Sequence, residues 1–503
     1  MNHNVLKRLS QCLLLFILFA IIVSCARNPV TGKREVMLVS EAKELQMGLQ
    51  SDPGIIANFG LYENESMQDF INEKGREMGA ISHRADLEYN FRILDSPVVN
   101  AFAVPGGFVY FTRGIMAHFS NEAEFAGVLG HEIGHITARH SAAQMSKQQL
   151  YGGLFTIGMI VSKEFRQFGD LAGQGLGALF LKFGRDDESQ SDELGVDYST
   201  QVGYDAHQMA NFFAVLKNLQ SQAGVNIPEW QSTHPDPANR FQNVHDLADK
   251  YQAGVDKSSL KINRNQYLDL IDGIVYGEDP RQGFVENNNF YHPQLKFQFP
   301  VPADWQLANT PQAVQMAEKN GKGIMLLRLS QAKTLQEAAQ AASEEYQFSV
   351  VESSNVNVNG NNAIAMISDI VPAAEQQQQQ QQQAPSLRVL SYFIQYDGLI
   401  YQMHGVAQVA DFNTYYNTFS NTMTNFRTLH DPNKINRLPN RIDIKTVSQS
   451  MTFSQALQQA GTPADEYDNL AILNNIALDA QLAVGTKIKT LTKEENQVLG
   501  GQK

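Results

Sequence analysis

The pentapeptide His131-Glu132-Ile133-Gly134-His135 constrains this chain more than any other stretch of its sequence. On an α-helix, residues four apart lie one above the other on the same face, about 6 Å apart along the axis. Both imidazoles can therefore reach one metal ion, and Glu132 then flanks the remaining metal position. The alternative is a chance match, which roughly 1–2% of chains of this length and composition would contain.

The residues around the motif favour a helix. Asn121 followed by Glu124 is typical of a helix N-terminus. Apolar residues continue at helical spacing through the motif, at Phe125, Val128, Leu129, Ile133 and Ile136. We therefore predict a helix of about 20 residues. Zinc lowers the pKa of a bound water to about 7, and a carboxylate beside it can take up the proton and pass it to a leaving amine.

Two histidines leave zinc one short of the three protein ligands of a typical catalytic site. The segment from Arg185 to Gly195 contains Glu188 and Asp192, which are also four residues apart. One carboxylate can bind the metal while the other accepts the free N–H of a ligating imidazole. Without the first motif, the segment would be interpreted as a charged, solvated start of a helix.

The two segments together resemble the gluzincin metallopeptidases of the HtpX and BepA kind, which include the CAAX prenyl proteases. Ser191 stands where that family usually has Ala before the Asp. The resemblance runs from about residue 28 to about residue 246 and includes further stretches: Asn28 to Gly32 with Leu38 to Glu41 resemble the family's mature N-terminus, Asn100 to Gly107 resemble the strand before its zinc helix, and Thr233 to Pro235 with Arg240 resemble its distal active-site segment.

This resemblance implies a role for each matching position. His131, His135 and Glu188 would bind one zinc ion per chain, Glu132 would be general base and acid, Asp192 would orient a ligand imidazole, and His234 and Arg240 would face the open side of the metal. His234 could stabilise the oxyanion, fill the fourth metal position and hold the enzyme latent, or be a turn residue before Pro235. His140, five residues after His135, is expected to point away from the metal face, so that it lies at the surface or supports a ligand rather than binding the metal itself.

A small sheet is predicted before the zinc helix. Residues 102–112 are rich in β-branched and aromatic residues, and apolar residues alternate from Leu87 to Ile93. Pro105 is tolerated best on an edge strand, and an exposed edge can pair with an extended peptide. We therefore expect unfolded or extended polypeptide as substrate, although an ordinary hairpin fits the same pattern. The substrate-binding edge would be Asn100, Ala101, Phe102 and Ala103.

The N-terminus predicts export. Lys7 and Arg8 precede an apolar run from Cys12 to Val23, which suits a signal-peptide core and is short for a membrane span. Its end, Ile22-Val23-Ser24-Cys25, resembles a bacterial lipobox, which implies cleavage before Cys25 and a membrane anchor through lipid on its sulfur. An uncleaved anchor is the alternative. With Cys12 removed, no disulfide forms, and Ala26 by resemblance favours an outer-membrane lipoprotein facing the periplasm.

Composition agrees with an exported protein. The formal charge is −13, and losing Lys7 and Arg8 takes it to −15, which argues against nucleic-acid partners and electrostatic docking on anionic lipid. About 480 mature residues are too many for one core. The predicted fold class is α+β. Its parts are a signal peptide (1–24), a mainly helical zincin-type metallopeptidase domain with a small edge-strand sheet (25–275), a linker (276–290), an α+β accessory domain (291–432) and a small module (440–495).

Residues 150–181 are rich in Gly, Leu, Ile and Phe but interrupted by charges, so they cannot span a membrane. Two buried helices or a mobile lid over the zinc cleft would fit. In the accessory domain, strands are predicted at 295–299, 323–329, 363–370 and 389–396, with a helix at 334–346. Phe297 to Trp305 resembles the opening of PsbP-like domains, which implies binding or positioning. Gln376 to Gln383 are predicted to lie in a loop between two strands.

The last segment, 442–491, is predicted to form strand, helix, helix and strand. Its second half resembles a LysM module, which implies peptidoglycan binding, but Ser450-Met451-Thr452 departs from that family's Gly-Asp-Thr. Two functions fit the whole chain. One is a zinc endopeptidase for misfolded or stalled periplasmic and outer-membrane proteins, and the other is a chaperone-like outer-membrane assembly factor with latent protease activity. The intact Glu132 favours the endopeptidase, because a binding protein needs no general base.

Overall fold

A computed structural model describes residues 25–151, 183–221, 234, 239–370 and 387–493 of the chain. The predicted signal peptide, most of the apolar stretch at 150–181 and the glutamine run therefore lie outside the described residues. Among the helices that are described, none has the length and apolar character needed to cross a membrane.

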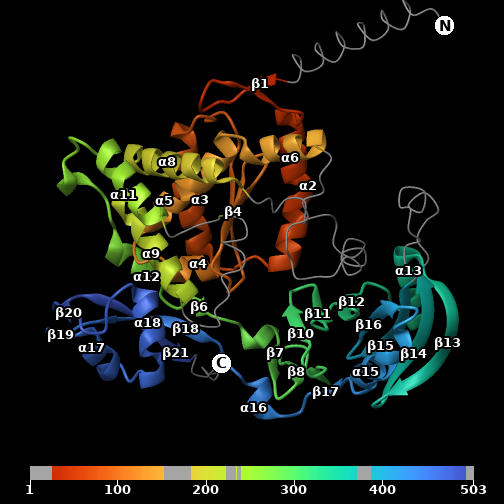
Figure 1. The fold of residues 1–503 in the computed structure, drawn as a ribbon. Helices are drawn as coiled ribbons and strands as arrows, with labels where there is room; N and C mark the ends of the chain where they lie inside the picture. The colour runs from red at the N-terminus through yellow and green to blue at the C-terminus, as the bar shows by residue number, and fades with distance from the viewer. Residues whose placement is uncertain (1–24, 152–182, 222–233, 235–238, 371–386, 494–503) are drawn as a thin grey trace, which may run out of the picture.

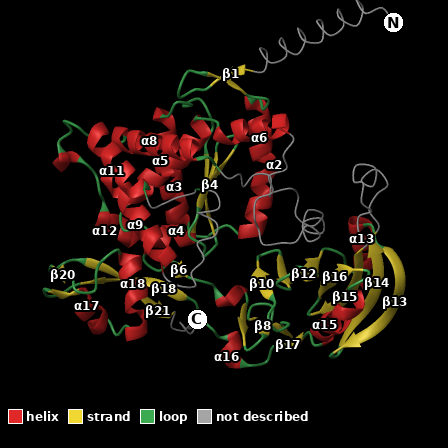
Figure 2. Cartoon of the chain, viewed as in Figure 1, coloured by secondary structure: helices red, strands yellow, loops and turns green. Residues whose placement is uncertain are grey.

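The N-terminal half is mainly helical (Figures 1 and 2). Its first elements are the hairpin β1 (Cys25–Arg27) and β2 (Arg34–Val36), followed by α2 (Glu41–Phe59) and α3 (Glu65–Ile81). A small sheet follows, made of β3 (Asn90–Leu94), β4 (Ala101–Val104) and β5 (Phe108–Thr112). The remaining helices are α4 (Arg113–His118), α5 (Glu122–Thr137), α6 (His140–Tyr151), α8 (Arg185–Gln201), α9 (His207–Ser221), α11 (Arg240–Tyr251) and α12 (Arg264–Ile271).

The strand β4 lies at one edge of this sheet, in the order β3-β5-β4, as the sequence predicts. Two details of the prediction are wrong. Pro105 lies in the turn between β4 and β5 rather than on the strand. The edge is also not exposed, since residues 101–104 keep at most 8% of their surface accessible. Helix α2 packs on one face of β4, where Ile55 joins Phe102, and α5 packs on the other.

Glycines allow α5 and α8 to pack closely. A Cβ placed on Gly130 of α5 would lie 3.0 Å from the Cα of Gly195 on α8, and one on Gly195 would lie 2.9 Å from the carbonyl oxygen of Gly127. Contacts of this length leave no space for a side chain. The two helices that carry the predicted metal ligands are therefore in backbone contact.

The accessory region forms a second body, with its own core (Figure 1, green to cyan). Its elements are β7 (Phe284–Glu286), β8 (Asn289–His292), β9 (Phe297–Pro300), β10 (Gln306–Asn309), β11 (Ala313–Ala317), β12 (Gly323–Ser330), α13 (Leu335–Tyr346), β13 (Ser349–Val358), β14 (Asn361–Ile370), β15 (Leu387–Tyr396), β16 (Leu399–Gln408), α15 (Phe412–Thr424), β17 (Arg427–Thr428) and α16 (Pro432–Ile435). Within the described residues, an antiparallel sheet runs β10-β11-β12-β16-β15-β14-β13. Helices α13 and α15 contact it through separate clusters of apolar side chains.

The predicted strands and helix of this region are present, but the linker at 276–290 is wrong. Those residues include β7 and the beginning of β8, which pair with each other and extend to β9 and β17. The reason is packing, because Phe290 is fully buried in the core of the accessory region. The polar, glycine-containing sequence does not predict this hairpin, because tertiary contacts rather than local preference stabilise it.

The C-terminal segment contains β18 (Asn440–Thr446), β19 (Met451–Thr452), α17 (Phe453–Gln459), α18 (Tyr467–Asn474), β20 (Gln481–Leu482) and β21 (Lys487–Lys493). The predicted strand, helix, helix and strand are present as β18, α17, α18 and β21, with the short strands β19 and β20 in addition. Strand β18 also pairs with β6 (Val275–Tyr276), and one hydrophobic cluster joins this segment to the N-terminal helices. The segment therefore packs into the core of the N-terminal region rather than forming a separate body.

A buried lysine reinforces that junction. Lys489 is fully buried, and its ammonium donates to the carbonyl oxygens of Ala117, Phe119 and Leu473 at 2.7–2.9 Å. Ala117 and Leu473 lie in the last turns of α4 and α18, where helix carbonyls lack partners within the helix. One lysine, whose pKa burial lowers to about 7, thus donates to the ends of two helices that are far apart in the chain.

Candidate metal centre

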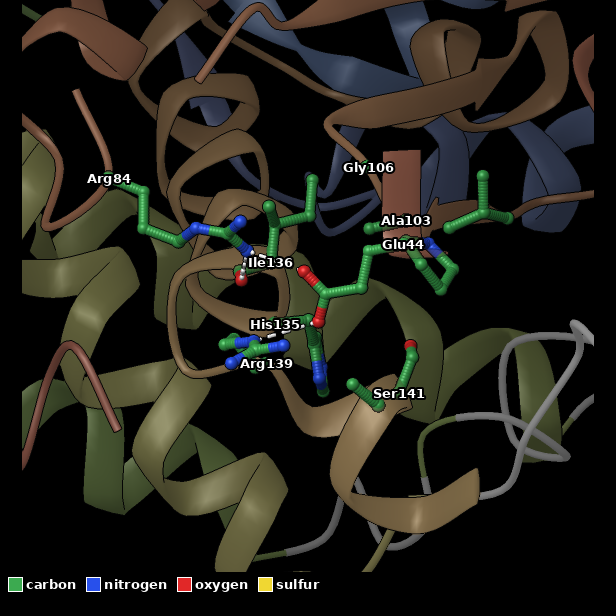
Figure 3. A pocket seen from close by; sticks show the side chains of 11 residues that line it. Glu44, Arg84, Ala103, Gly106, His135, Ile136, Arg139 and Ser141 are labelled. Atoms are coloured by element: carbon green, nitrogen blue, oxygen red, sulfur yellow. Dashed lines mark hydrogen bonds and ion pairs between the residues drawn. The ribbon is translucent and has the colours of Figure 1, made fainter. Parts of the chain in front are cut away.

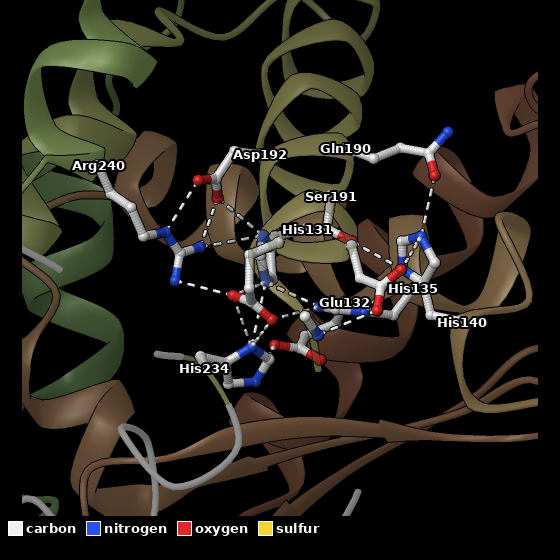
Figure 4. Close-up of polar contacts among 12 residues, drawn as sticks. His131, Glu132, His135, His140, Gln190, Ser191, Asp192, His234 and Arg240 are labelled. Carbon is white, nitrogen blue, oxygen red and sulfur yellow. Dashed lines mark hydrogen bonds and ion pairs between the residues drawn. The ribbon is translucent and has the colours of Figure 1, made fainter. Parts of the chain in front are cut away.

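Helix α5 presents the motif as predicted. Asn121 is the N-cap, and its side-chain oxygen accepts from the backbone N–H of Glu124 at 2.9 Å. Both histidines are buried, and the Nε2 atoms of His131 and His135 lie 3.1 Å apart (Figure 4). Successive turns of one helix therefore direct both nitrogens to the same point.

Helix α8 contributes both predicted carboxylates. The oxygens of Glu188 lie 3.7 Å from His131 Nε2 and 3.5 Å from His135 Nε2. Asp192 lies on the other side of His131, where Oδ1 is 2.9 Å from Nδ1. The Glu188 carboxylate thus lies beside the Nε2 atoms of both histidines. Asp192 can accept the N–H at the opposite ring nitrogen of His131.

His234 completes the group. Its Nδ1 lies 3.4 Å from His131 Nε2 and 3.0 Å from Glu188 Oε1, and its Nε2 lies 3.7 Å from Glu132 Oε1. At 1% exposure, the residue is buried. One donor atom from each of His131, His135, Glu188 and His234 lies within 4.8 Å of the others.

Arg240, the first residue of α11, holds the carboxylates in place. Its Nε donates to Asp192 Oδ2 at 2.8 Å, its Nη2 bonds to Oδ1, and its Nη1 lies 3.0 Å from Glu188 Oε2. Phe213 of α9 lies against the guanidinium, 4.2 Å from it. Arg240 therefore braces both carboxylates from the side away from His135.

These residues fit a zinc ion. Imidazole nitrogens and one carboxylate are the donor set that zinc takes in hydrolytic sites. Glu132 has both carboxylate oxygens buried, and neither has a hydrogen-bond partner among the described residues. Buried oxygens of this kind call for a water, an ion or a substrate group. Glu132 is thus positioned to serve a group bound at the cluster.

The electrostatics of the cluster suit ligation. Burial, with the neighbouring His131, lowers the pKa of His135 well below its usual range, which keeps the imidazole neutral and its lone pair available. Burial acts against the charge of Asp192, but Arg240 and His131 outweigh it and lower the pKa of Asp192. Burial raises the pKa of Glu132, against the opposing effect of His234. A general base with a raised pKa holds a proton more readily.

The structure adds residues that the sequence did not assign. His140 is buried, and its Nδ1 lies 3.0 Å from His135 Nδ1, so of the two predicted roles it has the contact with a ligand and not the surface position. Ser191, the departure from the family pattern, has its Oγ 3.3 Å from His140 Nδ1, and Gln190 Oε1 lies 2.9 Å from His140 Nε2. Phe183 stacks on the ring of His135 with centroids 4.0 Å apart. These contacts fix the orientation of His135.

Arg139 explains why His140 turns inward. Helix α5 ends at Thr137, and Arg139 has a φ of 59°, which redirects the chain before α6 begins at His140. Glu44 of α2 stabilises this turn by accepting from Arg139 Nε at 2.8 Å and from Arg84 Nη1 at 3.0 Å. A small cavity lies here, lined by Glu44, Ala103 and His135 among others (Figure 3).

Comparisons with known proteins agree with this geometry. The sequence pattern of peptidase family M48 matches residues 65–248. The beta-barrel assembly-enhancing protease of Yersinia pestis is 28% identical over 230 residues, which cover 44% of this chain and 47% of that protein. Its counterpart in Escherichia coli (strain K12) is 26% identical over 241 residues, covering 46% and 49%. The mitochondrial metalloendopeptidase OMA1 of Arabidopsis thaliana is 29% identical over 229 residues, covering 44% of each chain.

The chain spans about half the length of these curated relatives. Among solved structures, cyanobacterial PsbP from Synechocystis sp. PCC 6803 aligns with 28% of this chain and 91% of its own at 10% identity and a TM-score of 0.23, so the PsbP-like domain stays a prediction. Residues 65–248 include α5 and α8 with all their predicted ligands. The chain therefore carries a peptidase family M48 domain, of the kind found in the beta-barrel assembly-enhancing proteases.

Proposed function

We propose that the chain is a zinc-dependent metalloendopeptidase of the bacterial cell envelope that hydrolyses extended or misfolded proteins. The observation that carries the proposal is the buried group of His131, His135 and Glu188, beside which Glu132 has no hydrogen-bond partner among the described residues. When bound, zinc would supply a Lewis acid that acidifies a water and polarises the scissile carbonyl.

The side chains divide the remaining work. Glu132 takes a proton from the attacking water and delivers it to the leaving amine. Asp192 accepts the Nδ1–H of His131, which leaves Nε2 of that ring as the donor atom. Arg240 keeps Asp192 and Glu188 in register through its guanidinium.

His234 is the group that controls access. Because its Nδ1 lies among the donor atoms of His131 and Glu188, we propose that it fills the fourth metal position and holds the site latent. A role in stabilising the oxyanion would require the ring to move away from those atoms. Substrate would then enter only after His234 leaves.

The substrate is proposed to be polypeptide bound in extended form along β4, at residues 100–103. Residues 100–103 keep at most 8% of their surface accessible, so pairing of a substrate with this edge would require a local rearrangement. We further propose that Cys25 carries lipid and anchors the protein to the outer membrane, facing the periplasm. The names of the bacterial relatives, which are beta-barrel assembly-enhancing proteases, support substrates among outer-membrane proteins. Peptidoglycan binding by residues 440–495 is a further proposal.

The second candidate function is assistance in outer-membrane assembly with little hydrolysis. The position of His234 favours it, because a protein whose metal site is closed can still hold an extended chain. Replacing Glu132 with Gln separates the two functions. If the chain is chiefly a protease, cleavage of an unfolded outer-membrane protein and the rescue of a deletion strain should both disappear.

The matched control is Glu193→Gln. This residue lies on α8, where it accepts from Tyr251 Oη at 2.9 Å, outside the metal cluster. It undergoes the same chemical change and should leave cleavage and rescue intact. Rescue by Glu132→Gln without any cleavage would reject the protease as the main function.

A further inference from the structure

A second group of possible metal ligands lies at the contact between α9 and α11, outside the catalytic cluster. His207 is the first residue of α9, and His245 and Asp249 lie one turn apart on α11. His207 Nε2 is 3.0 Å from Asp249 Oδ1, and His245 Nδ1 is 3.6 Å from Asp249 Oδ2. One donor atom from each residue lies within 4.8 Å of the others.

We propose that His207, His245 and Asp249 form a second binding site for a divalent transition metal of the zinc class. Two imidazole nitrogens and a carboxylate oxygen match the donor preference of zinc, and water would complete a tetrahedral shell. Unlike the catalytic cluster, this group is open to solvent, since the side chains of His245 and Asp249 are 42% and 57% exposed. An ion can therefore enter without any movement of the chain.

The support of His207 distinguishes this group from a chance meeting of surface side chains. Its Nδ1 lies 2.8 Å from Asp205 Oδ1, and Asp205 is itself fixed by Gln208 Nε2 at 3.1 Å and by the backbone N–H of His207. A carboxylate that accepts the Nδ1–H of an imidazole leaves Nε2 as the metal donor and orients the ring. In this chain, Nε2 of His207 faces Asp249.

A metal bound here would stabilise the helix that carries Arg240 and so support the catalytic cluster indirectly. Arg240, which holds Asp192 and Glu188, begins the same helix that carries His245 and Asp249. His245 lies five positions after Arg240, which is about 7.5 Å along the helix axis. An ion tying α11 to α9 would therefore limit the motion of the helix that positions Arg240.

The competing interpretation is an ion pair without metal. Although burial opposes it, Asp249 and Asp205 raise the pKa of His207, so a protonated His207 could hold α9 and α11 together alone. The two interpretations differ in zinc stoichiometry. A metal site requires a second ion per chain, whereas the ion pair requires none.

The test counts zinc bound to the full-length chain after dialysis against micromolar free Zn²⁺. The wild-type chain should hold two ions, and the double variant His245→Ala/Asp249→Ala should hold one. Alanine favours the helix at these positions, so the fold should persist. The control Asp246→Ala removes a neighbouring exposed carboxylate of α11, which accepts from Gln242, and should still hold two ions.

Thermal unfolding provides a second, independent measure of zinc binding at this site. Added Zn²⁺ should raise the Tm of the wild-type chain further than that of the double variant. One ion in the wild type, or two ions in the double variant, would overturn the second site. Since cleavage depends on Glu132 and the buried cluster, either result would leave the proposed protease untouched.

Discussion

Replacing Asp192 with Asn tests how the structure supports its ligands. Asp192 accepts from His131 Nδ1 at 2.9 Å and from Arg240 Nε at 2.8 Å, and it also bonds to Nη2. Asparagine offers one acceptor oxygen, so its NH₂ group must face a donor. Loss of such a supporting carboxylate typically weakens metal binding about 10–100-fold, or about 1.4–2.7 kcal/mol.

The protein itself should also become less stable. The buried guanidinium of Arg240 loses one anion but keeps Glu188 at 3.0 Å, so we expect a cost near the lower end for a broken buried pair, about 3 kcal/mol. Competition with a chromophoric chelator measures the zinc affinity, and kcat is measured with saturating zinc. The exposed Asp186→Asn on α8 is the control. A zinc affinity of Asp192→Asn equal to that of this control would refute the reasoning.

Three further perturbations address other parts of the structure. Lys489→Met leaves buried helix-end carbonyls without a donor and should lower the unfolding free energy by about 3 kcal/mol; a urea midpoint like that of the wild type would contradict this role. Glu44→Gln removes the charge between Arg84 and Arg139 and should cost about 3 kcal/mol in the same assay, whereas an unchanged midpoint would show that the ion pairs contribute no net stability. His234→Ala should speed cleavage of unfolded protein if the ring holds the site latent; slower cleavage would instead indicate an oxyanion role.

The parts of the site that the sequence predicted are those set by local rules. A cap at Asn121 and helical spacing were enough to place His131 and His135 on one face. The same spacing placed Glu188 and Asp192 on successive turns of α8. Such patterns depend only on residues within one helix.

The sequence left His140 either at the surface or in contact with a metal ligand, because the choice depends on the turn between the two helices. The left-handed φ of Arg139 breaks α5 from α6 and returns His140 to His135. The turn is stabilised by the tertiary contact of Arg139 with Glu44 of α2, which local sequence patterns do not predict. Ser191 was noted as a small change, but its contact with His140 depends on how α8 crosses α6 and α5.

Long-range packing also explains the differences in the fold. The sequence predicts that β4 is an exposed edge strand. In the structure its residues are buried, and α2 and α5 pack on its faces. The sequence predicts that the C-terminal segment is a separate module. In the structure, Lys489 and the pairing of β18 with β6 join it to the N-terminal region. Neither arrangement follows from periodicity, because each unites residues that are far apart in the chain.

Diffraction from crystals of the zinc-loaded chain, measured at the zinc absorption edge, tests the catalytic site most directly. We expect an anomalous peak about 2.0–2.2 Å from His131 Nε2, His135 Nε2 and an oxygen of Glu188, with His234 as the fourth protein ligand. A peak that excludes Glu188, or the absence of any peak among these side chains at full zinc loading, would contradict a hydrolytic zinc centre in this chain.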